Sequence, residues 1–303
     1  MASSGPRPWS RSSSFRRTTS RRCSVSASRT GPGKESVAAP RRSPGDLLPV
    51  ALRAARAGAA VLLEAGLPRP GAAVELKGHG DYVTATDRRS EAAILEVLAR
   101  DSPGVAVLAE EGGGVRAASM WAVDPLDGTT NFTRGFPTVA VSVALLESGM
   151  PAVGAVLAPF LQLEFTVSRG GGAYMNGERL PQHRAIEPAS AVVATGFPFR
   201  DKALLARYLP VMERALERFE DLRRAGAAAL DLAWTASGTF DGFFELGLHT
   251  WDVAAGAALV LEAGGRVTDW SGGDGWIETG NIIAAAPAVH EVLLELAAHA
   301  PEG

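Results

Sequence analysis

Cysteine and long apolar runs are scarce in this chain of 303 residues. The single cysteine, Cys23, lies within residues 1–44, so the remainder has no thiol for a disulfide, a cysteine-ligated zinc or a nucleophile. No uncharged apolar run approaches the roughly 18 residues of a membrane-spanning helix. Hydrophobic residues make up 46% and charged residues 21% of the chain, which excludes a disordered chain and a coiled coil. We therefore expect a soluble globular protein with no membrane partner and a length typical of about two domains.

Motifs that depend on glycine, lysine or histidine are also missing. The sequence has no Walker A lysine followed by Ser or Thr and no HExxH, and its glycine-rich stretches at 112–114 and 170–172 lack the GxGxxG pattern. We interpret both stretches as turns. Four histidines are expected at the surface rather than as ligands: His79, His183, His290 and His299.

Acidic residues are nearly absent from the N-terminal segment. Residues 1–44 hold ten of the 30 Lys and Arg but one of the 33 Asp and Glu, so the formal net charge of −3 divides into +9 and −12. This Ser- and Arg-rich segment has too few aliphatic residues to form a core, and its composition is typical of an organelle transit peptide. We predict a disordered transit peptide over 1–45 and a chloroplast location, with the mitochondrion as the alternative.

Two other interpretations of this segment stay open. The alternatives to a transit peptide are a basic nucleic-acid-binding tail and upstream sequence translated from a misplaced start. The acidic remainder opposes nonspecific binding to nucleic acid, so we expect no nucleic-acid partner for the mature chain.

From residue 46 onwards, apolar periodicity predicts regular structure. Helices are expected from Asp46 to a stop at Gly66 and Pro68, and at about 88–100. Short β-branched or aromatic runs predict strands at 105–108, 120–124, 138–146, 152–158 and 163–167, and Asn176–Gly177 predicts a tight hairpin turn. Later, strands at 191–195, 243–246, 266–270 and 281–286 alternate with helices at 203–219, 225–237, 252–263 and 288–298. We predict an α+β domain over 46–190 and an α/β domain over 191–303.

Acidic residues recur where apolar runs end. They lie in the segments VTATD (83–87), AEEG (109–112), WAVDPLDGTTNF (121–132) and WDVAAG (251–256). Clustered and partly desolvated acids either have raised pKa values or are neutralised by cations. The two central segments have no Lys or Arg nearby, and all-oxygen ligation suits Mg²⁺. Taken singly, each segment favours an ordinary structural role, with Asp87 and Asp252 as helix caps and Asp127–Gly128 as a turn, but the four segments together favour a metal site.

The backbone after Asp127 supplies a second indication. Consecutive N–H groups from Gly128 to Asn131 would form an anion-binding nest or helix N-terminus. Metals beside such a backbone favour phosphoryl transfer.

These motifs resemble the inositol monophosphatase family of Mg²⁺-dependent, lithium-sensitive phosphatases, and especially its bacterial members. The resemblance extends over residues 46–300, including ATGFPF (194–199), RRAGAAALDLA (223–233) and DGFFELGLHTWD (241–252). It implies a layered αβαβα sandwich of the inositol monophosphatase and fructose-1,6-bisphosphatase type, in the α+β and α/β classes, and commonly a homodimer.

The resemblance also implies roles for particular residues. Glu110, Asp124 and the Leu126 carbonyl would bind one Mg²⁺, and Asp124, Asp127 and Asp252 a second, with Glu110 sharing a weaker third ion through water. Thr129 would hold the attacking water and Asp87 would accept the threonine proton, so Thr129, Asp87 and Glu110 are the candidate catalytic residues. The candidate substrate-binding residues are Gly128, Thr129, Ala228, Glu245 and Asp252.

Two departures from animal members are visible. Ala227 stands where some of them have Thr or Ser, and the loop at 77–80 is shorter, which weakens the case for a third ion and for lithium sensitivity.

The function implied is Mg²⁺-dependent hydrolysis of a small phosphorylated polyol, inositol 1-phosphate first. The alternative substrates are galactose 1-phosphate, histidinol phosphate, fructose 1,6-bisphosphate and 3′-phosphoadenosine 5′-phosphate. An alternative of another class is a non-catalytic regulator that binds transcription machinery, as some bacterial relatives do.

Overall fold

The computed structural model describes residues 44–69 and 85–299, which belong to one unit of the chain. The predicted transit peptide up to residue 43 and the loop at 77–80 lie outside the described residues. The helices are α1 (Pro44–Ala65), α2 (Ala85–Asp101), α3 (Thr129–Thr133), α4 (Leu205–Arg218), α5 (Ala228–Ser237), α6 (Thr250–Glu262), α7 (Trp276–Thr279) and α8 (Pro287–Ala298).

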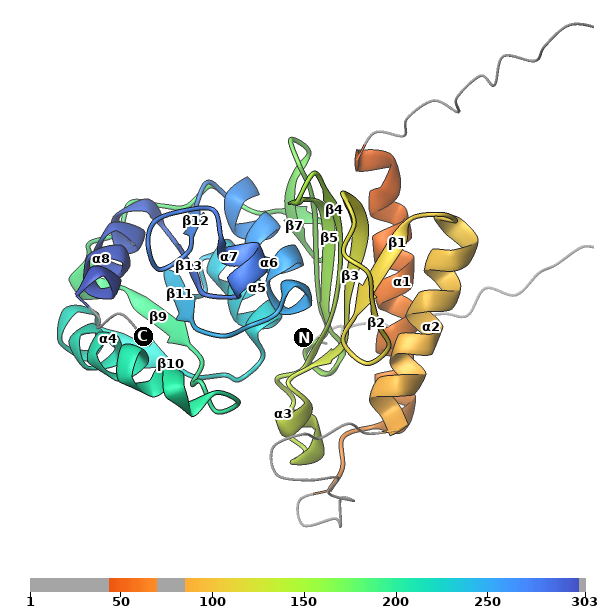
Figure 1. Ribbon diagram of the computed structural model, residues 1–303, viewed down its shortest axis with the longest axis horizontal. Helices are drawn as coiled ribbons and strands as arrows, with labels where there is room; N and C mark the ends of the chain where they lie inside the picture. The colour runs from red at the N-terminus through yellow and green to blue at the C-terminus, as the bar shows by residue number, and fades with distance from the viewer. Residues whose placement is uncertain (1–43, 70–84, 300–303) are drawn as a thin grey trace, which may run out of the picture. The chain divides into compact units, whose positions relative to one another are not determined.

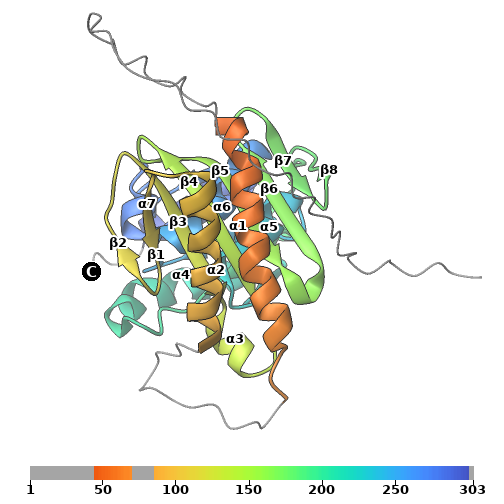
Figure 2. The same cartoon turned by 90° about the vertical axis from the view of Figure 1, so that its right-hand side faces the viewer.

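The first half of the chain forms an eight-stranded sheet in the order β2-β1-β3-β4-β5-β6-β7-β8. Its strands are β1 (Ala106–Ala109), β2 (Gly113–Gly114), β3 (Ser119–Asp127), β4 (Ala140–Glu147), β5 (Met150–Ala158), β6 (Leu163–Ser168), β7 (Gly172–Met175) and β8 (Glu178–Arg179). Only β1 and β3 pair in parallel, and the other neighbours are antiparallel. Helices α1 and α2 cover one face of this sheet, whereas α5 and α6 lie on the other (Figures 1 and 2).

Both faces of this sheet are buried, and alternation along β4 distributes its side chains between them. Val141, Val143 and Leu145 pack in the core with α1 and α2, whereas Ala144 and Leu146 pack in the core with α5 and α6. A strand covered on both faces needs an apolar residue at almost every position, which explains the continuous apolar runs in the sequence.

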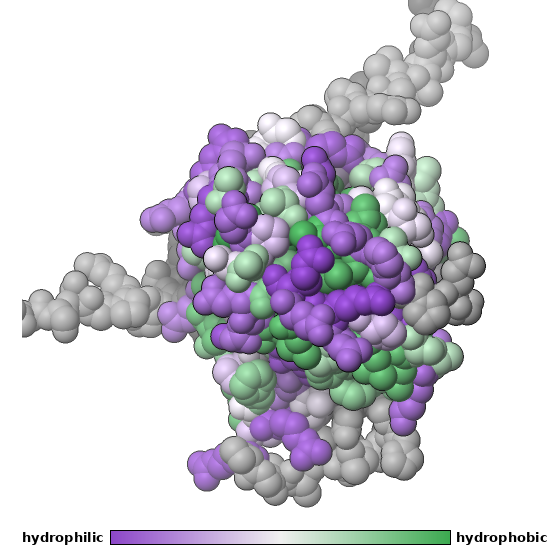
Figure 3. Space-filling model, turned by 90° about the vertical axis from the view of Figure 1, so that its left-hand side faces the viewer, coloured by the Kyte–Doolittle hydropathy of each residue, from purple (hydrophilic) through white to green (hydrophobic). Residues whose placement is uncertain are grey.

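The second half forms a five-stranded sheet in the order β10-β9-β11-β13-β12. Its strands are β9 (Val192–Thr195), β10 (Asp221–Arg223), β11 (Gly242–Glu245), β12 (Arg266–Thr268) and β13 (Ile282–Ala285). The pairings of β9 with β10 and β11 are parallel, and those of β13 are antiparallel. Helices α4 and α8 cover its outer face, and hydrophilic side chains intersperse with hydrophobic ones on that side of the molecule (Figure 3). The layers therefore follow the order α-β-α-β-α, which confirms the predicted sandwich (Figure 1).

The long predicted elements are confirmed to within a few residues, and so is the turn at Asn176–Gly177, where both residues have positive φ and Met175 pairs with Glu178. Six short elements were not predicted, because their two to five residues show neither a period nor an apolar run: β2, β7, β8, β10, α3 and α7. The prediction for His290 is wrong: this residue is 3% exposed, and its ring hydrogen-bonds to Thr268.

The boundary proposed near residue 190 falls between the two sheets. The division into separate domains at 46–190 and 191–303 stays a prediction. Within the described residues, no helix is long and apolar enough to cross a membrane.

Candidate active site

A cavity of about 190 Å³ opens where β1 and β3 end and where α5 and α6 begin. Every residue predicted for the site lines this cavity except Asp87: Glu110, Asp124, Leu126, Asp127, Gly128, Thr129, Ala228, Glu245 and Asp252. The volume is below the roughly 300–1,000 Å³ of pockets for drug-sized ligands, so the cavity suits a small ligand.

A β-bulge turns two carboxylates of β3 toward this cavity. Residues three apart on a regular strand face opposite sides of the sheet, yet Asp124 and Asp127 line the same cavity. The register between β3 and β4 shifts between these two residues, and the Leu126 N–H donates to Asp124 Oδ1 at 2.9 Å. The bulge at Pro125–Leu126 is therefore the local feature that brings both acids to one site.

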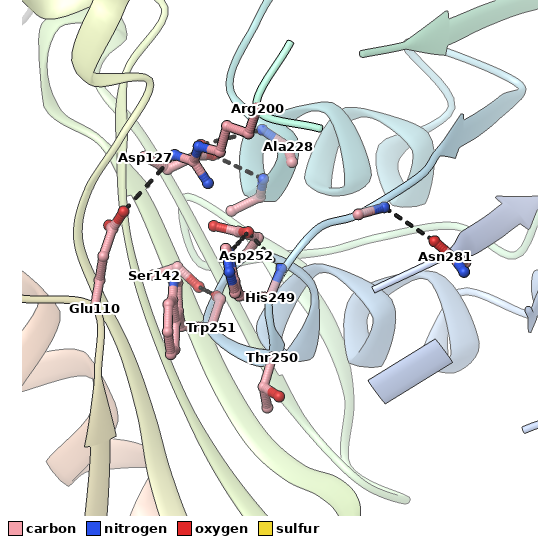
Figure 4. A network of polar contacts seen from close by, with 12 residues as sticks. Glu110, Asp127, Ser142, Arg200, Ala228, His249, Thr250, Trp251, Asp252 and Asn281 are labelled. Carbon is pink, nitrogen blue, oxygen red and sulfur yellow. Dashed lines mark hydrogen bonds and ion pairs between the residues drawn. The ribbon is translucent and has the colours of Figure 1, made fainter. Parts of the chain in front are cut away.

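The first turn of α5 holds Asp127. The N–H groups of Ala228 and Ala229 donate to its two carboxylate oxygens at 3.2 and 2.7 Å (Figure 4). A helix N-terminus favours negative charge, so this contact fixes the orientation of Asp127 and partly offsets its burial.

Asp252 lies in the first turn of α6. Its Oδ2 accepts the His249 N–H at 2.7 Å in a capping box, while the Ser142 hydroxyl donates to the Trp251 carbonyl at 3.1 Å and ties the start of α6 to β4 (Figure 4). Asp252 therefore has both predicted roles: its carboxylate caps α6 and also lines the cavity.

Glu110, Asp124 and Asp127 have raised pKa values. Burial, followed by repulsion from Asp252, raises the pKa of both Glu110 and Asp127 to about 7. Burial and repulsion from Glu110 raise the pKa of Asp124 well above its ordinary value. Each shift means that the site strongly favours neutralisation of its negative charge, by protons or by cations.

The donor chemistry of this cluster fits a hard divalent cation. Carboxylates and the Leu126 carbonyl present only oxygen atoms, which are the ligands that Mg²⁺ prefers. In the ranges 44–69 and 85–299, no group of three or more His, Cys, Asp or Glu side chains already forms a metal-binding cluster.

Thr129 begins the short helix α3 directly after the acids. Its hydroxyl lies 3.5 Å from Asp87 Oδ1 and 3.2 Å from the Leu126 carbonyl, and Asp87 is 1% exposed in the first turn of α2. Gly128 has φ 88°, and a Cβ there would lie 2.9 Å from the Thr138 carbonyl. Only glycine therefore fits this tight approach without strain.

Glu245, at the end of β11, lies next to Gly196, and both residues line the cavity. A Cβ on Gly196 would come within 2.0 Å of Glu245 Oε2, so the absence of a side chain at 196 makes room for the carboxylate. Burial, followed by repulsion from Asp231 and Asp252, raises the pKa of Glu245 well above its ordinary value.

The sequence analysis missed two arginines that line the cavity. Arg200 Nη2 lies 3.8 Å from Glu110 Oε1 (Figure 4), and the Arg224 guanidinium lies 5.5 and 5.4 Å from the ring centres of Phe197 and Phe199. The expectation that the acids have no basic residue nearby holds along the chain but is wrong in space. Arg224 lies in the segment RRAGAAALDLA, which was matched to the family without a role for this residue, and Arg200 directly follows the matched segment ATGFPF.

Known proteins share this architecture. An Escherichia coli K12 protein named Nus factor SuhB is 41% identical over 252 residues, which cover 82% of this chain and 94% of that protein. The solved structure of suhB from Bartonella henselae is 36% identical with a TM-score of 0.76 and covers 84% of this chain and 99% of its own. The inositol monophosphatase of Anabaena is 34% identical with a TM-score of 0.74, covering 85% of this chain and 97% of its own.

These relatives overturn the predicted chloroplast location and its mitochondrial alternative. They come from bacteria such as Pasteurella multocida, Escherichia coli, Bartonella henselae and Mycobacterium tuberculosis, which points to a bacterial protein. They also lend no support to a transit peptide. The error has a physical reason: a Ser- and Arg-rich composition shows that a segment cannot build a core, but it does not specify a destination.

The model of the inositol monophosphatase family matches residues 45–302, nearly all of the chain beyond the basic segment. This match agrees with the observed layers and with the acidic motifs at the cavity. Members of this family are generally Mg²⁺-dependent, and membership supports a phosphatase. The chain belongs to the inositol monophosphatase family.

Proposed function

We propose that this protein is a Mg²⁺-dependent phosphatase that hydrolyses phosphate monoesters of small polyols, with inositol 1-phosphate as its substrate. The observation that carries this proposal is a single small cavity that combines four carboxylates with the Thr129 hydroxyl and with Glu245. Such a cavity offers cation ligands, a position for water and acceptors for substrate hydroxyls within one space.

The carboxylates would hold the cations as a shared set. Glu110, Asp124 and the Leu126 carbonyl would hold one Mg²⁺, and Asp124, Asp127 and Asp252 a second, with Glu110 contributing to a third. When bound, Mg²⁺ neutralises phosphate charge, activates water and stabilises the leaving oxygen. The contacts of Asp127 with α5 and of Asp252 with His249 would keep these carboxylates oriented, because each leaves lone pairs free for a ligand.

Thr129 would position the water that attacks phosphorus. When its hydroxyl donates its one hydrogen to Asp87, the lone pairs of Oγ1 are left to accept a hydrogen bond from water. Asp87 would then fix the threonine rotamer from a buried position outside the cavity. The N–H groups of Gly128 and Thr129 would hold the phosphate.

The polyol would lie between Ala228 and Glu245. A carboxylate accepts hydrogen bonds from adjacent hydroxyls, and the small side chain of Ala228 leaves room for a ring. Histidinol phosphate lacks such a ring of hydroxyls and galactose 1-phosphate arranges its hydroxyls differently, so both are useful competitors.

A phosphate-release assay tests the proposal. The purified full chain with Mg²⁺ should release phosphate from inositol 1-phosphate faster than from galactose 1-phosphate or histidinol phosphate. Asp124→Asn should lose at least about a hundredfold in kcat, because one oxygen donor and one negative charge are removed from the shared set. Activity that survives this change, or that persists in excess EDTA, would contradict the mechanism.

A second candidate role rests on the curated relatives named Nus factor SuhB, which are about 40% identical to this chain. We infer that the chain, as a homodimer or as a monomer, also binds transcription machinery. Purified bacterial transcription elongation complexes should then retain the wild type and the inactive Asp124→Asn variant equally. Binding of neither protein would contradict this role.

A further inference from the structure

Arg200 faces the carboxylate cluster beside His249, whose Nδ1 lies 3.5 Å from Asp252 Oδ2. It lies in the segment that follows β9, and its guanidinium approaches Glu110 to 3.8 Å while its side chain is 63% exposed. Asp124, Asp127 and Asp252 line the same cavity as Arg200, and its ion pair is with Glu110.

The exposure of Arg200 distinguishes it from a structural ion pair. A partner that served packing would be buried and held by several hydrogen bonds, as Asp127 is held by Ala228 and Ala229. The contact from Arg200 to Glu110 is long for a hydrogen bond and belongs to a largely solvated side chain. Such a contact neutralises charge and is easily exchanged.

We propose that Arg200 is the internal counter-ion of the metal-free site: its guanidinium neutralises the carboxylate cluster until divalent cations replace it. Two cations that seek the same oxygens compete, so the charge that stabilises the metal-free cluster also weakens its affinity for Mg²⁺. The proposal rests on the proposed function in assigning these carboxylates to metal binding. It adds a residue that sets the metal affinity without serving as a ligand.

The neighbouring segment supports this exchange. Arg224 lies over the rings of Phe197 and Phe199, which belong to the segment directly before Arg200. These contacts tie the segment before Arg200 to Arg224, so we expect the guanidinium of Arg200 to leave Glu110 by rotation of its own exposed side chain.

Calorimetric titration of the EDTA-stripped full chain with Mg²⁺ alone tests the proposal. Arg200→Gln should bind Mg²⁺ roughly fivefold more tightly, the scale expected of one partly exposed ion pair. Lys202→Gln is the matched control. It removes one positive charge two residues from Arg200, and the Lys202 side chain does not line the cavity. This control should change the affinity less than about twofold, and Arg200→Lys should resemble the wild type.

Thermal unfolding provides a readout independent of metal affinity. Arg200→Gln should lower the Tm of the metal-free protein but leave the Tm at saturating Mg²⁺ unchanged, because the counter-ion is needed only without metal. Equal metal affinities of wild type and Arg200→Gln, or an equal effect of Lys202→Gln, would overturn the inference. If the wild type binds no Mg²⁺ at millimolar concentration, the proposed function fails as well, so the two failures are distinguishable.

Discussion

The contact between Gly196 and Glu245 makes a prediction about substrate recognition. A methyl group at position 196 would lie 2.0 Å from Oε2 and 2.1 Å from Oε1 of Glu245, whereas ordinary contacts are 3.4–4 Å. In Gly196→Ala the carboxylate must therefore retreat by more than about 1 Å. A hydrogen bond does not survive a shift of that size with its geometry intact.

The magnitude follows from the hydrogen bonds that would be lost. A hydrogen bond to a charged group is worth about 1.5–3 kcal/mol, which corresponds to roughly a 10- to 150-fold change in kcat/KM. The fold should tolerate the change, because the clash involves the end of a flexible side chain and Gly196 does not have a left-handed backbone conformation. We expect the Tm to change by no more than a few degrees.

Two substrates and one control variant separate recognition from chemistry. Gly196→Ala should lose activity toward inositol 1-phosphate but keep p-nitrophenyl phosphate hydrolysis within about twofold, because that substrate has no ring hydroxyls for Glu245 to bind. Glu245→Gln, which removes the charge without changing the shape, should show the same selectivity. Full activity of Gly196→Ala on inositol 1-phosphate, or an equal loss on both substrates, would refute this reasoning.

Three further predictions concern Thr129, His290 and Gly256. Thr129→Ala should lower kcat about 100-fold with little change in KM, measured by phosphate release, because only the positioning of water is lost. Burial lowers the pKa of His290 from 6.5 to about 4. As pH falls from 6.5 to 4, His290 is protonated in the unfolded chain before it is protonated in the folded protein, and urea unfolding should show a loss of stability of about 3 kcal/mol that is absent in His290→Gln. Gly256→Val should cost about 1–3 kcal/mol in the same assay, since even a Cβ at 256 would lie 2.4 Å from Leu232 Cβ between α5 and α6.

The layers were predictable wherever burial leaves a period in the sequence. The segments that became β4, β5, α6 and α8 are apolar at the spacing that their burial requires, so their type and limits could be read directly. The strand β10 escaped because three residues at a sheet edge, with both charged members exposed, carry no such pattern. His290 was misplaced because a polar residue on an apolar helix is buried or exposed according to one tertiary contact, here with Thr268.

The acids of the site were predictable for a related reason. Carboxylates at the ends of buried strands cannot avoid desolvation, and the raised pKa values of Glu110 and Asp127 agree with that expectation. Arg200 was not predictable, because its approach to Glu110 depends on how a loop outside the strands and helices places one long side chain. Acidic motifs reveal where negative charge gathers, whereas the partner of that charge is a tertiary property.

Asp252 shows why the alternatives of cap and ligand need not exclude each other. A capping residue must lie at a helix N-terminus, and the N-termini of α5 and α6 both open on the cavity. The positive end of each helix dipole stabilises a carboxylate there, Asp127 through α5 and Asp252 through α6, against the repulsion between them. Helix N-termini therefore stabilise Asp127 and Asp252 in the metal-free cluster, in addition to the charge of Arg200 near Glu110. It follows that Asp252→Asn, which can still accept the His249 N–H, should weaken Mg²⁺ binding far more than it destabilises the protein.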